Sequence, residues 1–515
     1  MRGVETLLTH PLVACACIWL PVIALLVARR QGQASAPAFA RLVVVAASAA
    51  ALLAYVAIVV WYAGQFTYFD RAEPTITAVA SVFGAGKPLY PALDAPERYA
   101  HIYGPGLFIL HAAAMALFGQ SILVSKAVGV SAILGSLIVG YWMFAARAGK
   151  TVALIATAAC ALVYMDFSNA TFWTRPDPIL IACAVVGLYC AILPRSIATL
   201  IVLGIATGAA INLKVSGPLY LLPAFALAGM APEDRRWHLA GSAGIAVVIG
   251  AAPFLLANVS LSHYVEYLEL SARNGLVAAK LRQNLEWAIF FLLPIAVVSF
   301  RRLDRFVIGL GCSLLTVAVV AAKPGGGPYH LLPFIPVLVY AMLRSPAHWE
   351  RPVTASVAVA FALTTLAFAV PRQVTFVTTV MGRHLTSQVG DLRRFADAHP
   401  SNSMAVGYAG TSYFSDARPE IVFRRREYLL DAPAVQEHRL SGLDVPASTI
   451  RALTDCATDY WLMPRGAEAF DVPSAYSPDG PPTVFPERFR QAFFRSYERT
   501  GSTRYFDVWA CKRGR

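Results

Sequence analysis

Charged residues and polar linkers are scarce in this sequence. Only 14% of its 515 residues are Asp, Glu, Lys or Arg, whereas an ordinary soluble domain carries about 25%. Hydrophobic residues make up 57%, and the mean hydropathy is +0.56. Before about residue 370 the chain has no polar linkers. It has apolar runs such as 42–60, which are long enough to cross about 30 Å of hydrocarbon. These features exclude a soluble enzyme, a disordered chain and a disulfide-rich secreted domain, and they predict a polytopic membrane protein.

Cysteine is also scarce, and the eight cysteines show no metal-ligand spacing. Six lie in apolar stretches and are expected to be small buried residues: Cys15, Cys17, Cys160, Cys183, Cys190 and Cys312. Cys456 and Cys511 lie in polar sequence, where a disulfide and two free thiols are both open. A disulfide would require an oxidising compartment. The sequence has no internal repeat and no low-complexity tract.

Apolar runs recur along the chain, and we predict about twelve membrane spans from them. The runs are 12–28, 42–63, 122–145, 151–166, 178–193, 197–213, 217–230, 239–258, 286–300, 306–322, 329–343 and 353–370. The first run is followed, not preceded, by a basic pair, so a retained span with an outer N-terminus is favoured over a cleaved signal peptide.

Basic residues outnumber acidic ones, 43 to 30, which gives a formal net charge of +13. In membrane proteins such an excess collects in cytoplasmic loops, so we expect no nucleic-acid partner. Six loops rich in basic residues all fall on the cytoplasmic side, provided that the run 104–118 does not cross the membrane. This run begins Gly-Pro-Gly, which suits an interfacial or re-entrant helix. The basic residues of the six loops are Arg29, Arg30, Arg41, Arg147, Lys150, Arg195, Arg235, Arg236, Arg301, Arg302, Arg305, Arg344 and Arg351.

This topology places the loops 64–121, 167–177, 259–285 and 323–328 outside the cytoplasm, together with the C-terminal tail. We expect residues 1–370 to form the membrane domain and residues 371–515 a small extracytoplasmic α/β domain. Strands are predicted at 405–408, 460–463 and 505–510, and helices near 387–398 and 486–497. The predicted fold class is mainly α, a helical membrane bundle with this small domain, in a bacterial inner or plasma membrane.

Two acids in the first outer loop, Asp70 and Glu73, are candidates for catalysis. Residues three apart can lie on one face of a helix, and an amphipathic helix is predicted at 75–85. An N-terminal helix cap is the simpler interpretation, because Glu73-Pro74 is a good helix start. Tyr103 begins the interfacial run and is a candidate for substrate binding. A tight turn without a functional role would also explain this residue.

Charged and polar residues gather at the other outer positions. Arg175 and Asp177 lie at the mouth of a span, where Asp177 could also be a boundary marker, but ionisable residues in membranes are usually functional. Lys214 occupies a short hinge between two apolar runs, where it either snorkels to the surface or meets an anionic partner.

A glycine-rich outer segment holds the last candidates, Lys323, Tyr329 and His330. The three glycines at 325–327 expose backbone N–H groups that can cradle an anion such as phosphate. A plain turn explains these glycines equally well.

In their order these pieces resemble the GT-C superfamily of membrane glycosyltransferases, in the branch of protein mannosyltransferases and lipid A aminoarabinose transferases. The resemblance covers roughly residues 42–343. Its elements are Asp70 with Glu73, Gly86-x-x-x-Tyr90, Tyr103-Gly-Pro-Gly, Phe118-Gly119, Arg175-x-Asp177, Lys214 before Gly-Pro, and Tyr329-His-Leu-Leu-Pro333. The family's adjacent Asp-Glu pair is replaced here by Asp70-x-x-Glu73, which leaves open which acid is catalytic.

The resemblance implies an enzyme that transfers a hexosyl or pentosyl group from a polyprenyl-phosphate carrier. The acceptor would be an extracytoplasmic glycan, lipid or protein. Glycosyl transfer needs a base for the acceptor and cations for the departing phosphate. Glu73 is the first choice for the base and Asp70 the second. Lys214, Lys323 and His330 are the candidates for phosphate, with Arg175 beside them.

Cofactors and other functions remain open at this point. No cofactor is required, but Asp70, Glu73 and Asp177 could share a divalent cation with the phosphate. A transporter or flippase of an anionic lipid or solute would explain the spans and buried charges equally well. It would not explain a long first loop with paired acids, and the hydropathy shows no inverted repeat. A scaffold that binds cell-wall glycan is the third hypothesis.

Overall fold

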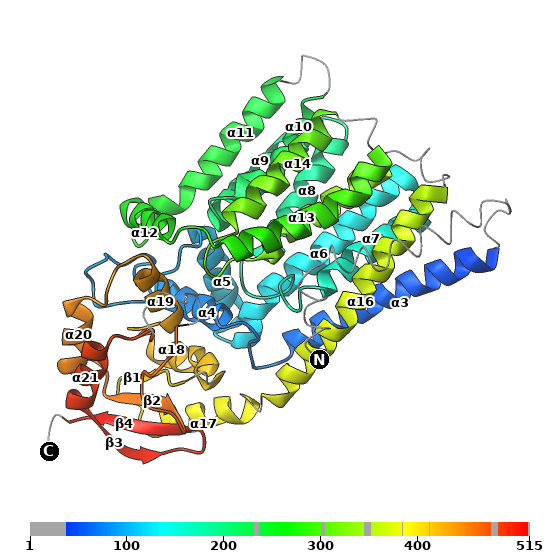
Figure 1. Ribbon diagram of the computed structural model, residues 1–515. Helices are drawn as coiled ribbons and strands as arrows, with labels where there is room; N and C mark the ends of the chain where they lie inside the picture. Colours follow the sequence, from blue (N-terminus) through cyan, green and yellow to red (C-terminus); the bar gives the residue numbers. More distant parts are fainter. Residues whose placement is uncertain are drawn as a thin grey trace. The chain divides into compact units, whose positions relative to one another are not determined.

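The computed structural model describes residues 38–230, 236–299, 304–344, 352–383, 385–410, 413–474 and 483–512. These residues are mainly helical, with one small sheet (Figure 1). Among the described residues, four helical stretches are long and apolar enough to cross a membrane: Leu42–Ala63, Ile122–Ala148, Trp237–Leu255 and a fourth that begins at Ala360. Seven shorter apolar helices have 10–17 residues, less than the roughly 20 that a straight span needs. The count of twelve spans therefore stays a prediction, and the run 12–28 lies outside the described residues.

The chain divides into two compact units. Unit 1 comprises Met1–Tyr62, Gly129–Gly250 and Leu276–Val377, and unit 2 comprises Ala63–Val128, Ala251–Gly275 and Thr378–Arg515. The helices that lie wholly or mostly in unit 1 are α3 (Ala38–Ala63), α6 (Ile122–Ala148), α7 (Lys150–Met165), α8 (Asp177–Ile192), α9 (Ile197–Leu213), α10 (Gly217–Ala228), α11 (Arg236–Ala251), α13 (Ala278–Ser299), α14 (Arg305–Val320), η3 (Pro328–Phe334), α15 (Ile335–Leu343) and α16 (Pro352–Gly382).

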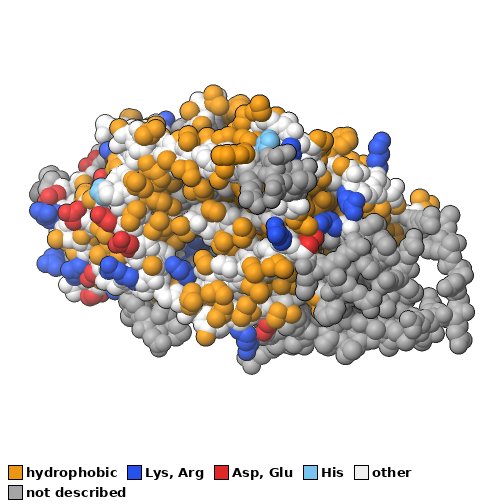
Figure 2. All heavy atoms as spheres, turned by 90° about the horizontal axis from the view of Figure 1, so that it is seen from above, with side chains coloured by type: hydrophobic (Ala, Val, Ile, Leu, Met, Phe, Trp, Pro, Cys, Tyr) orange, Lys and Arg blue, Asp and Glu red, His pale blue; other side chains and the backbone are white. Residues whose placement is uncertain are grey.

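Small residues let the helices of unit 1 pack closely. Gly204 and Gly208, four residues apart on α9, face Ile245 and Ile249 of α11, and a Cβ atom on either glycine would come within 2.8 Å of those side chains. Such small-xxx-small pairs are a common way to join membrane helices. Other faces carry exposed apolar side chains, and Figure 2 shows broad areas of hydrophobic side chains on the face seen there. A surface of this kind suits lipid better than water.

The last helix of unit 1 is longer than expected. The sequence predicts a span that ends at residue 370, before Pro371, but α16 continues through this proline to Gly382. Proline removes one backbone hydrogen bond and ordinarily ends or kinks a helix. Three residues of this extension, Gln373, Phe376 and Val380, are buried, so the helix is longer than the apolar run 353–370 from which the span is predicted.

Unit 2 joins the first outer loop to the C-terminal segment. Its helices are α4 (Ala72–Gly84), α5 (Pro105–Phe118), η2 (Ala252–Leu255), α12 (Leu261–Arg273), α17 (Leu385–Ala398), η5 (Tyr413–Ala417), α18 (Pro419–Arg425), α19 (Ala432–Leu440), α20 (Ala447–Thr454) and α21 (Glu487–Ser496). The predicted helix at 75–85 is α4, and the run 104–118 forms the 14-residue α5.

The sheet of unit 2 has four strands in the order β1-β2-β4-β3: β1 (Met404–Val406), β2 (Tyr460–Pro464), β3 (Tyr497–Ser502) and β4 (Phe506–Cys511). The first two strands are parallel, and the other pairs are antiparallel. Three strands lie where the sequence predicts them. The strand β3 was not expected, because its sequence is polar and only Tyr497 is buried, as suits an exposed edge strand.

Aromatic residues fill the core behind the sheet. Trp461 on β2 packs against Phe470 and Phe493 with ring centroids 5.4 and 6.3 Å apart. Cys456 forms a disulfide with Cys511 at the end of β4, with Cα atoms 5.9 Å apart. The disulfide that the sequence left open is therefore formed, and it closes a loop across this core.

Candidate active site

The two first-loop acids form the start of α4. The Oε1 atom of Glu73 accepts hydrogen bonds from the backbone N–H groups of Phe69 (3.3 Å) and Asp70 (3.2 Å), and Glu73 is completely buried. The Oδ1 atom of Asp70 accepts from the N–H of Ala72 at 2.9 Å, and Asp70 is partly exposed. The bond from Ala72, the first residue of α4, satisfies one N–H group that a helix start leaves unpaired, whereas the two N–H groups bound by Glu73 lie just before the helix. We call residues 68–75 the acid turn.

Two cations that sequence reasoning missed hold the acid turn and the segment before it. Lys126 of α6 is completely buried, and its ammonium donates to the carbonyl oxygens of Gln65 (3.0 Å) and Thr67 (2.9 Å). Arg383, just after α16, donates from Nη1 to the carbonyl oxygens of Tyr68 (2.5 Å) and Phe69 (3.3 Å). A lysine inside an apolar helix is a signal that could have revealed Lys126, whereas Arg383 carries none.

Tyr103 lies in unit 2 as well. Its carbonyl oxygen accepts a hydrogen bond from the hydroxyl of Tyr90 at 2.7 Å, and its ring stacks on His101 at a centroid distance of 6.1 Å. These contacts link the Gly86-x-x-x-Tyr90 and Tyr103-Gly-Pro-Gly segments that the resemblance rests on. Tyr103 is partly exposed, so the structure shows an ordered turn, and its role toward a substrate stays a prediction.

Lys214, Asp177 and His330 meet in unit 1. The ammonium of Lys214 lies 2.8 Å from Oδ1 of Asp177 and 2.8 Å from Nδ1 of His330. Because an ammonium can only donate, Nδ1 of His330 must accept, which leaves the ring proton of neutral His330 on Nε2. Asp177 is completely buried, and its Oδ2 also accepts from the indole of Trp173 at 3.1 Å. Asp177 thus orients and neutralises Lys214, and it is not a mere boundary marker.

The local backbone explains why Lys214 is turned inward. Lys214 follows the last residue of α9, and its carbonyl oxygen accepts from the N–H of Gly217 at the start of α10 (2.8 Å). A Cβ atom at Gly217 would lie 1.9 Å from the carbonyl oxygen of Ala210. Only glycine permits so close an approach, so the Gly-Pro after Lys214 builds the tight hinge that the sequence indicates.

Arg175 and Tyr329 extend this cluster. Arg175 donates from Nη2 to the hydroxyl of Tyr329 at 2.6 Å, and its guanidinium lies 4.1 Å from the ring centroid of Trp173. Tyr329 and His330 have ring centroids 4.3 Å apart. We call Arg175, Asp177, Lys214, Tyr329 and His330 the basic cluster. The structure therefore brings five predicted residues from three separate segments together.

Lys323 lies in the glycine-rich turn that precedes η3, and it is partly exposed. Its carbonyl oxygen accepts from the N–H of Gly326 at 2.9 Å, while Lys280 of α13 donates to the carbonyl oxygen of Gly326 at 2.9 Å. Gly325 has a φ of +77°, a conformation that favours glycine. The contacts that the structure gives this turn are those of a folded loop, and the role of Lys323 in phosphate binding stays a prediction.

A divalent cation at Asp70, Glu73 or Asp177 stays a prediction. Among the described residues, no group of three or more His, Cys, Asp or Glu is arranged to hold a metal ion. Glu73 is engaged by backbone N–H groups, and Asp177 by Lys214 and Trp173.

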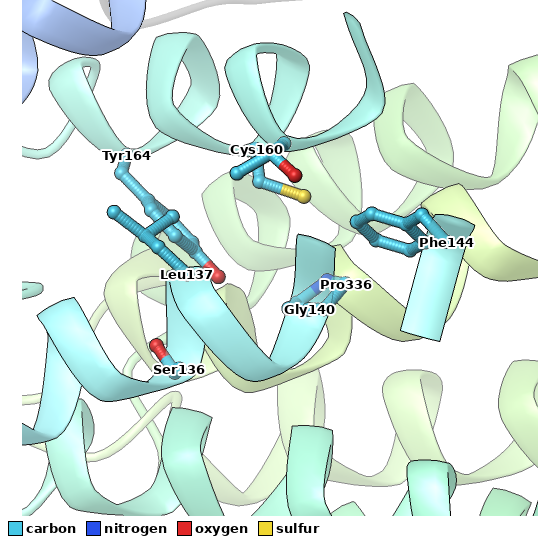
Figure 3. Close-up of a pocket in the computed structure, with 8 residues that line it drawn as sticks. Ser136, Leu137, Gly140, Phe144, Cys160, Tyr164 and Pro336 are labelled. Atoms are coloured by element: carbon cyan, nitrogen blue, oxygen red, sulfur yellow. The ribbon is translucent and has the colours of Figure 1, made fainter. Parts of the chain in front are cut away.

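Unit 1 also holds a small internal cavity of about 10 Å³ between α6, α7 and α15 (Figure 3). Its lining includes Tyr164, whose buried hydroxyl has no hydrogen-bond partner among the described residues. A volume of this size holds about one water molecule, which would satisfy the hydroxyl. The cavity is therefore far too small for a sugar or a lipid phosphate.

No protein-family model matches the sequence, and no curated protein does. Solved structures match over most of the chain. ArnT from Cupriavidus metallidurans bound to undecaprenyl phosphate has a TM-score of 0.52 at 14% identity, covering 92% of this chain and 98% of that chain. Its apo form has a TM-score of 0.56 at 14% identity, covering 90% and 98%. The chain has the GT-C fold.

The arabinosyltransferase EmbB from Mycobacterium smegmatis also matches, with a TM-score of 0.43 at 14% identity over 91% of this chain and 48% of that chain. At 14% identity the likeness to ArnT establishes the fold alone. The likeness to ArnT confirms the fold that the resemblance implies, while the count of about twelve spans stays a prediction.

Proposed function

We propose that this chain is a membrane glycosyltransferase that moves a sugar from a polyprenyl-phosphate carrier to an acceptor outside the cytoplasm. The basic cluster is the observation that carries the proposal, because it gathers a lysine, an arginine and a histidine N–H within a GT-C fold. A site that must stabilise a departing phosphate needs such cationic donors. ArnT, which shares the fold, has been seen with undecaprenyl phosphate bound.

In this mechanism Lys214 and His330 bind the carrier phosphate, and Arg175 supports them. Asp177 holds Lys214 in place and keeps it charged. The acceptor hydroxyl attacks the anomeric carbon, the bond from that carbon to the phosphate oxygen breaks, and the phosphate leaves with the electron pair. Cations held in fixed positions before the reaction stabilise the charge that develops on this oxygen.

We assign the general base to Asp70 and a supporting role to Glu73. The sequence favours Glu73, but that carboxylate is fully buried and accepts two backbone hydrogen bonds. Asp70 is partly exposed at the same turn, so it is the more accessible of the two acids to an acceptor hydroxyl. Removal of the acceptor proton by a positioned base contributes about 10²–10⁴-fold to the rate of such reactions.

The test is an assay of the purified full-length protein with polyprenyl-phosphate-linked sugars of defined hexose or pentose. We expect release of polyprenyl phosphate with transfer or hydrolysis of the sugar. Asp70→Asn should lower kcat by at least about a hundredfold, the lower end of the range for a general base, with donor binding unchanged. Asp94→Asn, which alters an exposed acid of the same loop, is the matched control.

Each alternative gives a different result in this assay. Donor binding without turnover by the wild type would favour the transporter or flippase, and movement of the carrier across liposome membranes would establish it. Absence of both binding and turnover would favour a scaffold. Turnover that survives in Asp70→Asn would remove the base assignment.

A further inference from the structure

Arg418 connects the C-terminal part of unit 2 to the acid turn. It immediately precedes α18, and 2% of its surface is exposed. Its Nη2 atom donates to the carbonyl oxygen of Arg71 at 3.2 Å and to the hydroxyl of Thr75 at 2.7 Å. These contacts join residues 343 and 347 positions apart in the sequence. One guanidinium therefore binds two points of the turn that carries Asp70.

Asp431 completes the connection from the start of α19. It is completely buried, and its Oδ1 atom accepts from Nη2 of Arg418 at 3.0 Å and from the hydroxyl of Thr75 at 2.9 Å. Burial alone would raise the pKa of Asp431, but Arg418, His101 and Tyr428 together hold it well below its usual range. Asp431 is therefore an anion at neutral pH and a strong acceptor.

The hydroxyl of Thr75 is shared by both charged groups, since it accepts from Arg418 and donates to Asp431. Only a side chain with both a donor and an acceptor can do this. Arg383 meanwhile binds the carbonyl oxygens at the other end of the turn, at residues 68 and 69. The backbone on both sides of Asp70 is thus fixed by arginines from the C-terminal part of the chain.

The C-terminal segment also contacts the first loop at residues outside the acid turn. Arg98 pairs with Leu430 in a β-bridge, and the hydroxyl of Thr449 donates to the carbonyl oxygen of Pro96 at 2.8 Å. Both contacts join the first loop to the C-terminal segment at residues 96 and 98, which lie outside the acid turn. A buried ion pair usually adds little stability compared with apolar packing, but it does define a direction and a distance.

We propose that Arg418, Asp431 and Thr75 are positioning residues that hold the acid turn so that Asp70 is aimed for proton removal. This inference rests on the proposed function, in which Asp70 is the base. The C-terminal segment then has a part in catalysis without contributing a group that touches the substrate. A misplacement of about 1 Å can lower a rate about a hundredfold, which is the scale on which such positioning acts.

The test compares three single variants with the wild type. Thr75→Val removes the shared hydroxyl and leaves Arg418 and Asp431 paired within the C-terminal part. Thr75→Ser keeps the hydroxyl. Thr449→Val is the matched control, because it removes a buried hydroxyl that joins the same segments away from the acid turn. For each variant kcat, the KM values for donor and acceptor, donor binding and thermal unfolding are measured.

We expect Thr75→Val to lower kcat roughly tenfold to a hundredfold, with donor binding and KM for the donor unchanged. Thr75→Ser should restore kcat, and Thr449→Val should keep it while lowering the unfolding temperature as much as Thr75→Val does. Equal kcat in Thr75→Val and Thr449→Val would overturn the inference. So would a loss of kcat in Thr75→Ser as large as in Thr75→Val, or a Thr75→Val variant that does not fold.

Asp70→Asn in the same experiment separates the two proposals. If Asp70→Asn is inactive while Thr75→Val is normal, the positioning inference is wrong and the base assignment stands. If Asp70→Asn keeps full turnover, the base assignment fails whatever Thr75→Val shows.

Discussion

At the scale of single residues, burial makes charged groups depend on specific partners. Lys214 is 8% exposed and Asp177 is completely buried, and each is the other's counter-ion at 2.8 Å. Removing one partner of a buried pair usually destabilises a protein by about 3–5 kcal/mol, because the other charge stays behind. A test of Lys214 must therefore separate the binding of phosphate from the stability of the fold.

A paired substitution makes that separation. Lys214→Met should raise the apparent KM for the donor by about 10–150-fold, which corresponds to the loss of about 1.5–3 kcal/mol from a charge-assisted contact. The double variant Lys214→Met with Asp177→Asn restores neutrality, so it should regain thermal stability while the KM for the donor stays high. Normal donor affinity in the stable double variant would show that Lys214 is structural. His330→Ala should act in the same direction as Lys214→Met.

At the scale of elements, α4 shows how a helix start and a reactive group share the same residues. Glu73 lies in the first turn and accepts from two backbone N–H groups just before the helix, and an acid at a helix N-terminus is also favoured by the helix dipole. Glu73 further supplies negative charge near the buried ammonium of Lys126. Asp70 accepts from the first N–H group of α4 and Glu73 from N–H groups just before the helix, and Asp70 is the more exposed of the two acids.

Glu73→Gln tests this division of roles. The amide oxygen of Gln can still accept the backbone hydrogen bonds, but the charge that faces Lys126 is lost. We expect lower thermal stability, while turnover per folded molecule falls less than about tenfold, because a base would contribute at least about a hundredfold. A loss of a hundredfold or more in properly folded Glu73→Gln would show that Glu73 is the base, as the sequence by itself favours. Circular dichroism and size-exclusion chromatography supply the folded fraction.

At the scale of the whole molecule, sidedness decides which substrates the chain can meet. The basic loops favour a C-terminal segment outside the cytoplasm, and the disulfide between Cys456 and Cys511 is typical of an oxidising compartment. Both observations support an extracytoplasmic acceptor.

Reporter fusions test the sidedness directly. Alkaline phosphatase fused after Arg515 should be active, and a fluorescent protein fused at the same point should be dark. A fusion after Arg351, in a loop that we predict to be cytoplasmic, is the control and should give the opposite result. The reverse pattern at Arg515 would move the C-terminal segment to the cytoplasm and overturn the proposed acceptor side.

The sequence by itself determined the local features of this protein. Runs of apolar residues predicted the long apolar helices, and short strand-like segments predicted three of the four strands, whereas the short helices α18, α19 and α20 were not predicted. The Gly-Pro after Lys214 predicted the tight hinge, and charged residues at the ends of apolar runs predicted the members of the basic cluster. Each of these signals depends only on residues that are close together in the sequence, or on the free-energy cost of placing a charge in hydrocarbon. These features can therefore be predicted without knowledge of long-range contacts.

Only the tertiary structure decided which charges are buried together. In the sequence Arg383, Arg418 and Asp431 lie in a polar segment and look like surface residues. In the folded chain each of the three forms a hydrogen bond with a residue of the acid turn. Their partners lie more than 300 positions away. The same packing buries Glu73 and leaves Asp70 partly exposed. Local pattern cannot specify such pairs, because burial and hydrogen-bond partners are fixed by how distant segments pack.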